Sequence, residues 1–141
     1  METATKTSIT VQAIVHAPVE KVWAYWSEPK HITQWNQPSP DWHSPRAEND
    51  LRAGGKFKFN MAARDGSMSF DFEGVYDNVQ INKRLEYTIG DGRKVNVIFT
   101  ANGNKTEIAE TFETENFHSI EMQRGGWQAI LESFKNYTEA H

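Results

Sequence analysis

The feature that most constrains the fold is a two-residue alternation of apolar and polar side chains between Lys56 and about Glu113. Its first stretch places Phe57, Phe59 and Met61 on one face, as a half-buried antiparallel strand requires. Turn sequences interrupt the alternation at Asp65-Gly66, Asn82-Lys83, Asp91-Gly92 and Asn102-Gly103-Asn104. Such turns join neighbouring antiparallel strands. The pattern therefore predicts a meander of five strands.

A long amphipathic helix is predicted after the meander, from about His118 to Tyr137. Its apolar residues recur at helical spacing and form a broad stripe: Trp127, Ile130, Leu131, Phe134 and Tyr137. Gly125-Gly126 lies inside this helix, where each glycine costs about 1 kcal/mol relative to alanine. We therefore expect the glycines to allow a close approach to the sheet or to a neighbouring loop.

The residues before Lys56 predict a strand, two short helices and a loop. Thr7–Val15 alternates as a strand, Pro18 starts a short helix at its first position, and Pro29 starts a second that runs to about Trp35. The stretch 36–50 contains three prolines and shows little periodicity, so we expect a loop there. Trp42 lies in the middle of this loop and is expected to pack against the rest of the chain.

These elements together predict an α+β helix-grip fold over residues 1–141, interpreted as a single domain. A curved antiparallel sheet would wrap around the long C-terminal helix, with two short helices after the first strand. A strongly twisted meander has one concave apolar face, and the last helix is the long apolar element that can cover it. We expect an apolar cavity between them.

Composition excludes several classes of protein. The formal net charge of −4 argues against nucleic acid and anionic membranes as partners. Cysteine is absent, so disulfides and thiolate metal sites are excluded. Met1–Thr10 does not have the pattern of a signal peptide, and no segment is apolar enough to insert in a membrane, so a cytoplasmic location is predicted. No nucleotide-binding or hydrolase motif and no histidine spacing suited to metal is present, so no metal and no cofactor are predicted.

The chain resembles the START-like (SRPBCC) superfamily, and within it the bacterial proteins of the Hsp90 ATPase activator homologue 1-like family. The resemblance rests on the order and spacing of several segments: 17–23 (Ala-Pro-Val-Glu-Lys-Val-Trp), Trp35, 54–57 (Gly-Gly-Lys-Phe), 72–76 (Phe-Glu-Gly-Val-Tyr) and Gly126-Trp127. It implies the helix-grip fold and its cavity, and spans lipid carriers, hormone receptors and polyketide cyclases, so it does not imply one reaction.

Glu110 is the leading candidate for chemistry. It alternates with Ile108 and Phe112, so it would be a carboxylate facing an aromatic cavity, where burial raises a pKa and creates an acid, a base or a ligand anchor. The competing interpretation places it solvated or paired with an arginine near the cavity mouth. His43, beside Asp41 and Trp42, is a second acid–base candidate, against a simpler role as a solvated loop residue. Tyr76 or Tyr87, whichever faces inward, could add a hydroxyl.

The residues predicted to contact a ligand are mostly aromatic, and each could equally belong to a close-packed core. They are Trp35, Trp42, Phe57, Phe59, Phe70, Phe72, Tyr76, Phe99, Glu110, Phe112, Trp127 and Leu131.

Three functions remain open on this basis. The first is binding of an apolar or aromatic small molecule, such as a lipid or a polyketide-like compound. The second is an enzyme of cyclase, dehydratase or hydrolase type that uses Glu110 with His43 or Tyr76. The third is a protein-interaction module related to Hsp90 co-chaperones, which would show an exposed apolar patch and a filled interior. The oligomeric state is left open between a monomer and a weak dimer.

Overall fold

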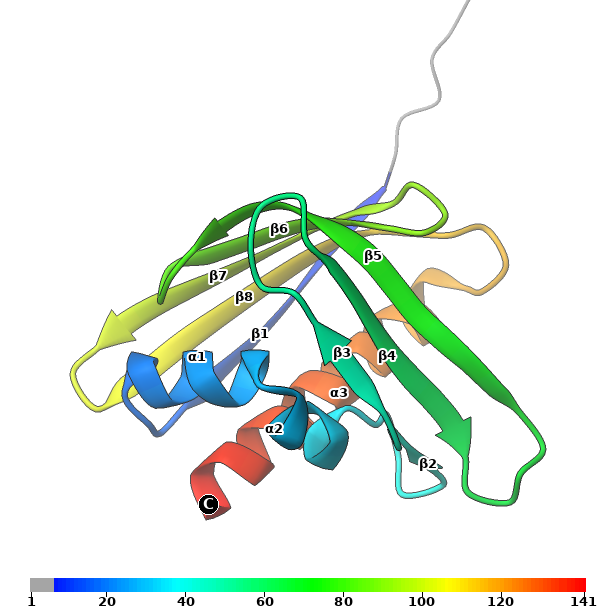
Figure 1. Ribbon diagram of the computed structural model, residues 1–141, viewed down its shortest axis with the longest axis horizontal. Coiled ribbons are helices and arrows are strands. Elements are labelled where there is room, and N and C mark those ends of the chain that lie inside the picture. Colours follow the sequence, from blue (N-terminus) through cyan, green and yellow to red (C-terminus); the bar gives the residue numbers. More distant parts are fainter. Residues whose placement is uncertain (1–6) are drawn as a thin grey trace, which may run out of the picture.

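The computed structural model describes residues 7–141, so the expectation for the first six residues lies outside it. A curled antiparallel sheet arches over three helices (Figure 1). The strands are β1 (Ser8–Val15), β2 (Trp42–His43), β3 (Ala47–Asn49), β4 (Lys56–Ala63), β5 (Ser69–Gln80), β6 (Arg84–Ile89), β7 (Lys94–Asn102) and β8 (Lys105–Glu113). The helices are α1 (Val19–Ser27), α2 (Pro29–Trp35) and α3 (Ile120–Ala140). This is the α+β helix-grip architecture that the sequence predicts.

The sheet has the order β1-β8-β7-β6-β5-β4-β2, with β3 also paired to β4. The five predicted strands are β4 to β8, and the predicted turns connect them. Gly66, Gly92 and Gly103 take positive φ at three of these turns, and Asn82 does so at the fourth, which is the backbone conformation that tight turns require. The chain before β4 differs from the prediction, because β2 and β3 form short strands at the sheet edge. Prolines confine them to a few residues without preventing edge pairing.

Three helix boundaries differ by one to three residues from those predicted, one of them the end of α3, which lies at Ala140 rather than at about Tyr137. Pro18 precedes α1 as its cap rather than occupying the first helical position, and its carbonyl accepts from Val22 N at 3.1 Å. The helix α3 begins at Ile120 because the Ser119 side chain caps it, accepting from Met122 N at 3.1 Å. His118 therefore lies in the preceding turn.

The helix α3 is fastened along the free edge of β1. Three of its side chains bond backbone groups of that edge: Gln128 to Gln12 O at 3.0 Å, Lys135 to Ile14 O at 2.8 Å, and Glu139 to His16 N at 2.8 Å. These bonds satisfy edge groups that have no neighbouring strand.

Two sets of helices cover the inner face of the sheet, the short helices α1 and α2 and the long helix α3. Phe99 packs against α1, with its ring centroid 5.3 Å from Trp23 and 5.5 Å from Trp26. Phe134 of α3, which is fully buried, packs on Trp26 at 4.9 Å and Trp35 at 5.0 Å. The short helices fill this end of the interior because their tryptophans are large enough to reach both layers.

Candidate functional site

A pocket of about 490 Å³ opens at the other end, between the inner face of the sheet and the first half of α3. Its wall is mostly apolar and aromatic, with a few polar groups. The lining residues are Trp26, Trp35, Asn36, Pro38, Phe59, Met61, Phe70, Phe72, Tyr87, Arg93, Glu110, Glu115, His118, Met122, Gln123, Gly126, Trp127 and Ile130.

Glu110 is the buried charged group of this pocket. It lies in the middle of β8, opposite Val11 of β1 and Val97 of β7, and alternation turns it inward with Ile108 and Phe112. Its side chain is only 6% exposed, and no hydrogen bond or ion pair joins it to another of residues 7–141. Burial raises the pKa of its carboxyl group to about 8. Glu110 is therefore mostly protonated at neutral pH.

Tyr87 of β6 brings a second polar group to the same pocket. Its side chain is buried, and its hydroxyl makes no hydrogen bond to another described residue. Burial raises its pKa well above the ordinary value, and the nearby charge of Glu110 raises it further. Tyr87 thus remains a neutral hydroxyl that can donate or accept a hydrogen bond.

Tyr76 also points inward, because it pairs directly with Tyr87 across β5 and β6. The expectation that only one of the two tyrosines faces inward is therefore wrong. The Tyr76 hydroxyl, however, is already used: it donates to Asn49 Oδ1 at 2.6 Å. Burial raises its pKa, with that hydrogen bond acting in the opposite direction. Tyr76 supports the wall of the pocket without lining it.

The aromatic wall is held in place by ring contacts. Trp127 of α3 stacks on Phe112 of β8, with centroids 4.1 Å apart and planes 9° from parallel. Phe72 meets the same tryptophan edge-on at 6.1 Å. Trp26 and Trp35 lie 5.2 Å apart at the opposite wall. These contacts restrict the rings of the wall to few orientations.

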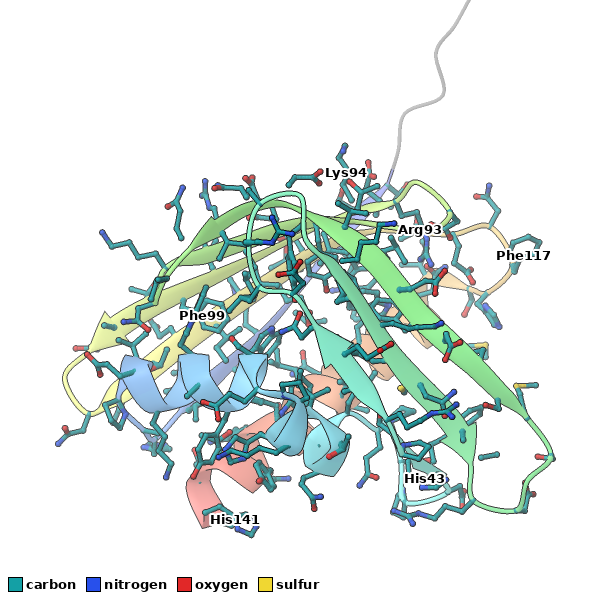
Figure 2. All side chains as sticks on the ribbon, viewed as in Figure 1. His43, Arg93, Lys94, Phe99, Phe117 and His141 are labelled. Carbon is teal, nitrogen blue, oxygen red and sulfur yellow. The ribbon has the colours of Figure 1, made fainter. Side chains whose placement is uncertain are left out.

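The mouth of the pocket is more polar and is ordered by side-chain hydrogen bonds. Arg93 Nε donates to Asp91 at 2.8 Å, at the β6–β7 turn, and Figure 2 shows Arg93 at this end of the sheet. His118 Nδ1 lies 2.6 Å from a Glu115 carboxylate oxygen, and this hydrogen bond lowers the pKa of Glu115. Gln123 donates to the carbonyls of Glu115 and His118, at 3.1 and 2.8 Å, and so ties the loop before α3 to the helix.

The paired glycines of α3 do not serve a close approach, and that expectation is wrong. A Cβ atom added at Gly125 or Gly126 would meet nothing within 4 Å. Gly125 is exposed, whereas Gly126 lines the pocket. The missing side chain at Gly126 leaves space in the pocket, which gives a physical reason for an unfavourable residue in mid-helix.

The structure brings six of the predicted ligand contacts together around the pocket: Trp35, Phe59, Phe70, Phe72, Glu110 and Trp127. The other six do not line it: Trp42, Phe57, Tyr76, Phe99, Phe112 and Leu131. Most of these are core residues, while Trp42 packs on Phe70 at 6.0 Å, as expected of a packed loop residue. His43 lies on the edge strand β2 and does not line the pocket (Figure 2). Neither proposed partner of Glu110, His43 or Tyr76, lines the pocket with it.

Sequence reasoning missed Gln123, Gly126, Met122 and Arg93 as pocket residues. Tyr87 is one of the two hydroxyl candidates of the sequence, but its pairing with Tyr76 depends on a register shift between Tyr76 and Asn78 that the β5–β6 turn alone does not predict. Gln123, Gly126 and Met122 line the pocket because of the position of α3 along the sheet, and Arg93 because it lies at the β6–β7 turn. No local pattern specifies that this end of the sheet stays open.

A larger groove of about 670 Å³ lies on the outside, between α2, β3 and the outer face of β4. It is lined by charged side chains such as Lys30, Arg46 and Glu48, and Lys58 pairs there with Asp71 at 3.8 Å. Its buried polar residue, Asn60, already donates to Asp71 Oδ1 at 3.0 Å. This groove therefore lacks the unpaired buried group that marks the inner pocket.

Within residues 7–141, no helix has the length and hydropathy needed to cross a membrane.

Comparison with known structures supports one family. A solution structure of the AHSA1-like protein from Aeromonas hydrophila is 41% identical, with a TM-score of 0.89 over 95% of this chain and 93% of its own. Chr148 from Cytophaga hutchinsonii is 59% identical, with a TM-score of 0.82 over 94% and 92%. A crystal structure of a Nitrosomonas europaea protein, 19% identical, shares the fold with a TM-score of 0.81 over 94% of each chain.

No protein with a curated description matches this chain. The family model described as Activator of Hsp90 ATPase homolog 1-like protein matches residues 16–139, nearly the whole length. The fold of its superfamily commonly binds ligands in a cavity. The chain therefore belongs to the Activator of Hsp90 ATPase homolog 1-like family, within the START-like (SRPBCC) superfamily.

Proposed function

We propose that this protein binds an apolar or aromatic small molecule in the pocket between the sheet and α3. One observation carries the proposal: Glu110, 6% exposed, faces this aromatic pocket without a hydrogen-bond partner among residues 7–141. The fully enclosed unpaired side-chain atoms of the described residues are Asn96 Oδ1 and Thr138 Oγ1, so the Glu110 oxygens open onto the pocket. A ligand with a polar group can bond them there, and a polar group that loses water without gaining a partner is costly.

The size and wall of the pocket agree with this function. A volume of about 490 Å³ is within the range of small-molecule sites, which are mostly apolar with a few placed polar groups. An interaction module with a filled interior would not leave this space. An enzyme would need a second acid–base group beside Glu110. The other titratable side chains that line the pocket are Tyr87, Arg93, Glu115 and His118, and Tyr87 interacts electrostatically with Glu110.

The paired glycines of α3 provide a matched test. Gly126→Leu is expected to place a side chain in the pocket and to weaken binding of N-phenyl-1-naphthylamine, a neutral apolar fluorophore, at least tenfold. Gly125→Leu is expected to leave binding within twofold, because that position faces solvent. Both changes remove a helix glycine and should stabilise α3 by about 1 kcal/mol or less. Fluorescence titration measures the affinities, and thermal unfolding confirms that both variants fold.

Equal binding by the two variants would contradict the proposal, as would failure of the unaltered protein to bind the fluorophore. Loss of binding in Gly125→Leu alone would place the site outside the pocket.

A further inference from the structure

The pocket contains an acidic group with no counter-charge. The pKa of Glu110 is shifted by burial alone, with no contribution from a neighbouring cation. The cationic side chain that lines the pocket, Arg93, is engaged at the mouth, where it bonds Asp91 at 2.8 Å and the Glu113 carbonyl at 3.4 Å. The strands beside Glu110 present Val11 and Val97 to it. The position opposite this carboxyl group is therefore open to a positive charge supplied by a ligand.

The wall of the pocket is also suited to a cation. Three tryptophans line it, Trp26, Trp35 and Trp127, together with Phe59 and Phe72. Aromatic faces attract cations, tryptophan most strongly, and the attraction grows when the cation is removed from water. The net charge of −4 favours the approach of cations over anions.

We propose that the pocket selects hydrophobic organic cations, that is, amines with an aromatic or alicyclic body, whose ammonium group pairs with Glu110. The unbonded Tyr87 hydroxyl accepts a second hydrogen bond from the same ammonium. This inference rests on the proposed function and specifies the chemical class of its ligand.

Pairing with an ammonium requires Glu110 to give up its proton to solvent. With a pKa of about 8 in the free protein, the carboxyl group is mostly protonated at pH 6 and half ionised at pH 8. Amine binding therefore strengthens as the pH rises through this range, and one proton is released for each ligand bound at the lower pH. A neutral ligand that accepts a hydrogen bond from the protonated acid would show the opposite trend. The other titratable groups lining the pocket are Tyr87, Arg93, Glu115 and His118.

The test uses four ligands with one naphthalene body: 2-naphthylmethylamine, 2-naphthylmethanol, 2-acetylnaphthalene and 2-naphthoate. At pH 8 the amine is expected to bind at least tenfold more tightly than the alcohol or the ketone, and the carboxylate weakest of all. The affinity for the amine should rise at least tenfold from pH 6 to pH 8. Titration calorimetry in buffers of different ionisation enthalpy measures both the affinity and the released proton.

Glu110→Gln provides the control, since the amide has the shape of the acid and cannot ionise. In this variant the amine is expected to lose both its advantage over the alcohol and its pH dependence. Binding of the alcohol and the ketone with no preference for the amine would overturn the inference but leave the proposed function intact. If none of the four ligands binds, both fail.

Discussion

Glu110→Gln is expected to make the protein more stable than the unaltered chain at pH 9, by about 3 to 5 kcal/mol, and to differ from it by less than about 1 kcal/mol at pH 5. The reason is that burial raises the pKa of Glu110 from its ordinary value of 4.5 to about 8. The folded state therefore binds this proton more tightly than the unfolded state does. Stability is fully retained below pH 4.5, falls as the pH rises from there, and levels off above pH 8.

Urea unfolding at pH 5, 7 and 9 measures this difference, and comparison with the variant removes the effects of all other titrating groups. Glu107→Gln is the matched control, because Glu107 lies three residues away on β8 and is exposed. Substitutions of exposed residues usually change stability by less than about 0.5 kcal/mol. If Glu110→Gln and the unaltered protein lost stability in parallel between pH 5 and pH 9, Glu110 would be solvated or paired, and the account of the pocket would be wrong.

Gly74→Ala is expected to destabilise the protein by about 3 kcal/mol or more, enough to prevent folding if the starting stability is low. A Cβ atom at Gly74 would overlap the Thr88 carbonyl oxygen of β6 and lie 2.8 Å from Cζ of Phe57. The Phe57 ring covers this glycine and contacts four other rings, those of Phe59, Phe72, Tyr76 and Tyr87. It cannot move aside without disturbing the pocket wall.

Gly90→Ala is the control for this substitution. Gly90 lies at the same end of β5 and β6, and its added Cβ atom would be 3.8 Å from the nearest atom, the Glu73 carbonyl oxygen, which is an ordinary contact. It should change stability by less than about 1 kcal/mol. Denaturant midpoints of the two variants measure this difference in stability. Equal midpoints would mean that β5 and β6 can separate at Gly74 without loss of stability.

The sheet was predictable from sequence because its strands follow local rules. Alternation in β4 to β8 assigns each side chain to a face, and the Asp-Gly and Asn-Gly turns set the register between neighbours. The inward orientation of Glu110 follows from the same alternation. The short strands β2 and β3 were not predictable, since each is created by pairing with β4 rather than by a pattern of its own.

The boundary between pocket and core could not be predicted, because it depends on the packing of the helices. Phe99 and Phe72 have the same alternating pattern, yet Phe99 is covered by α1 and Phe72 lines the pocket. The length of α1 and the path of α3 along β1 determine which of these two residues a helix covers. The sequence therefore predicts which residues face inward but not which of them remain uncovered.

The most direct test of the binding site uses the five tryptophans as internal probes. Trp26, Trp35 and Trp127 line the pocket, whereas Trp23 is buried against Phe99 and Trp42 lies on β2. In NMR spectra of the ¹⁵N-labelled protein titrated with 2-naphthylmethylamine, the indole resonances of the first three are expected to shift, with those of Trp23 and Trp42 nearly unchanged. Shifts confined to Trp42, or no shift at any indole at saturating ligand, would contradict the assignment of this pocket as the binding site.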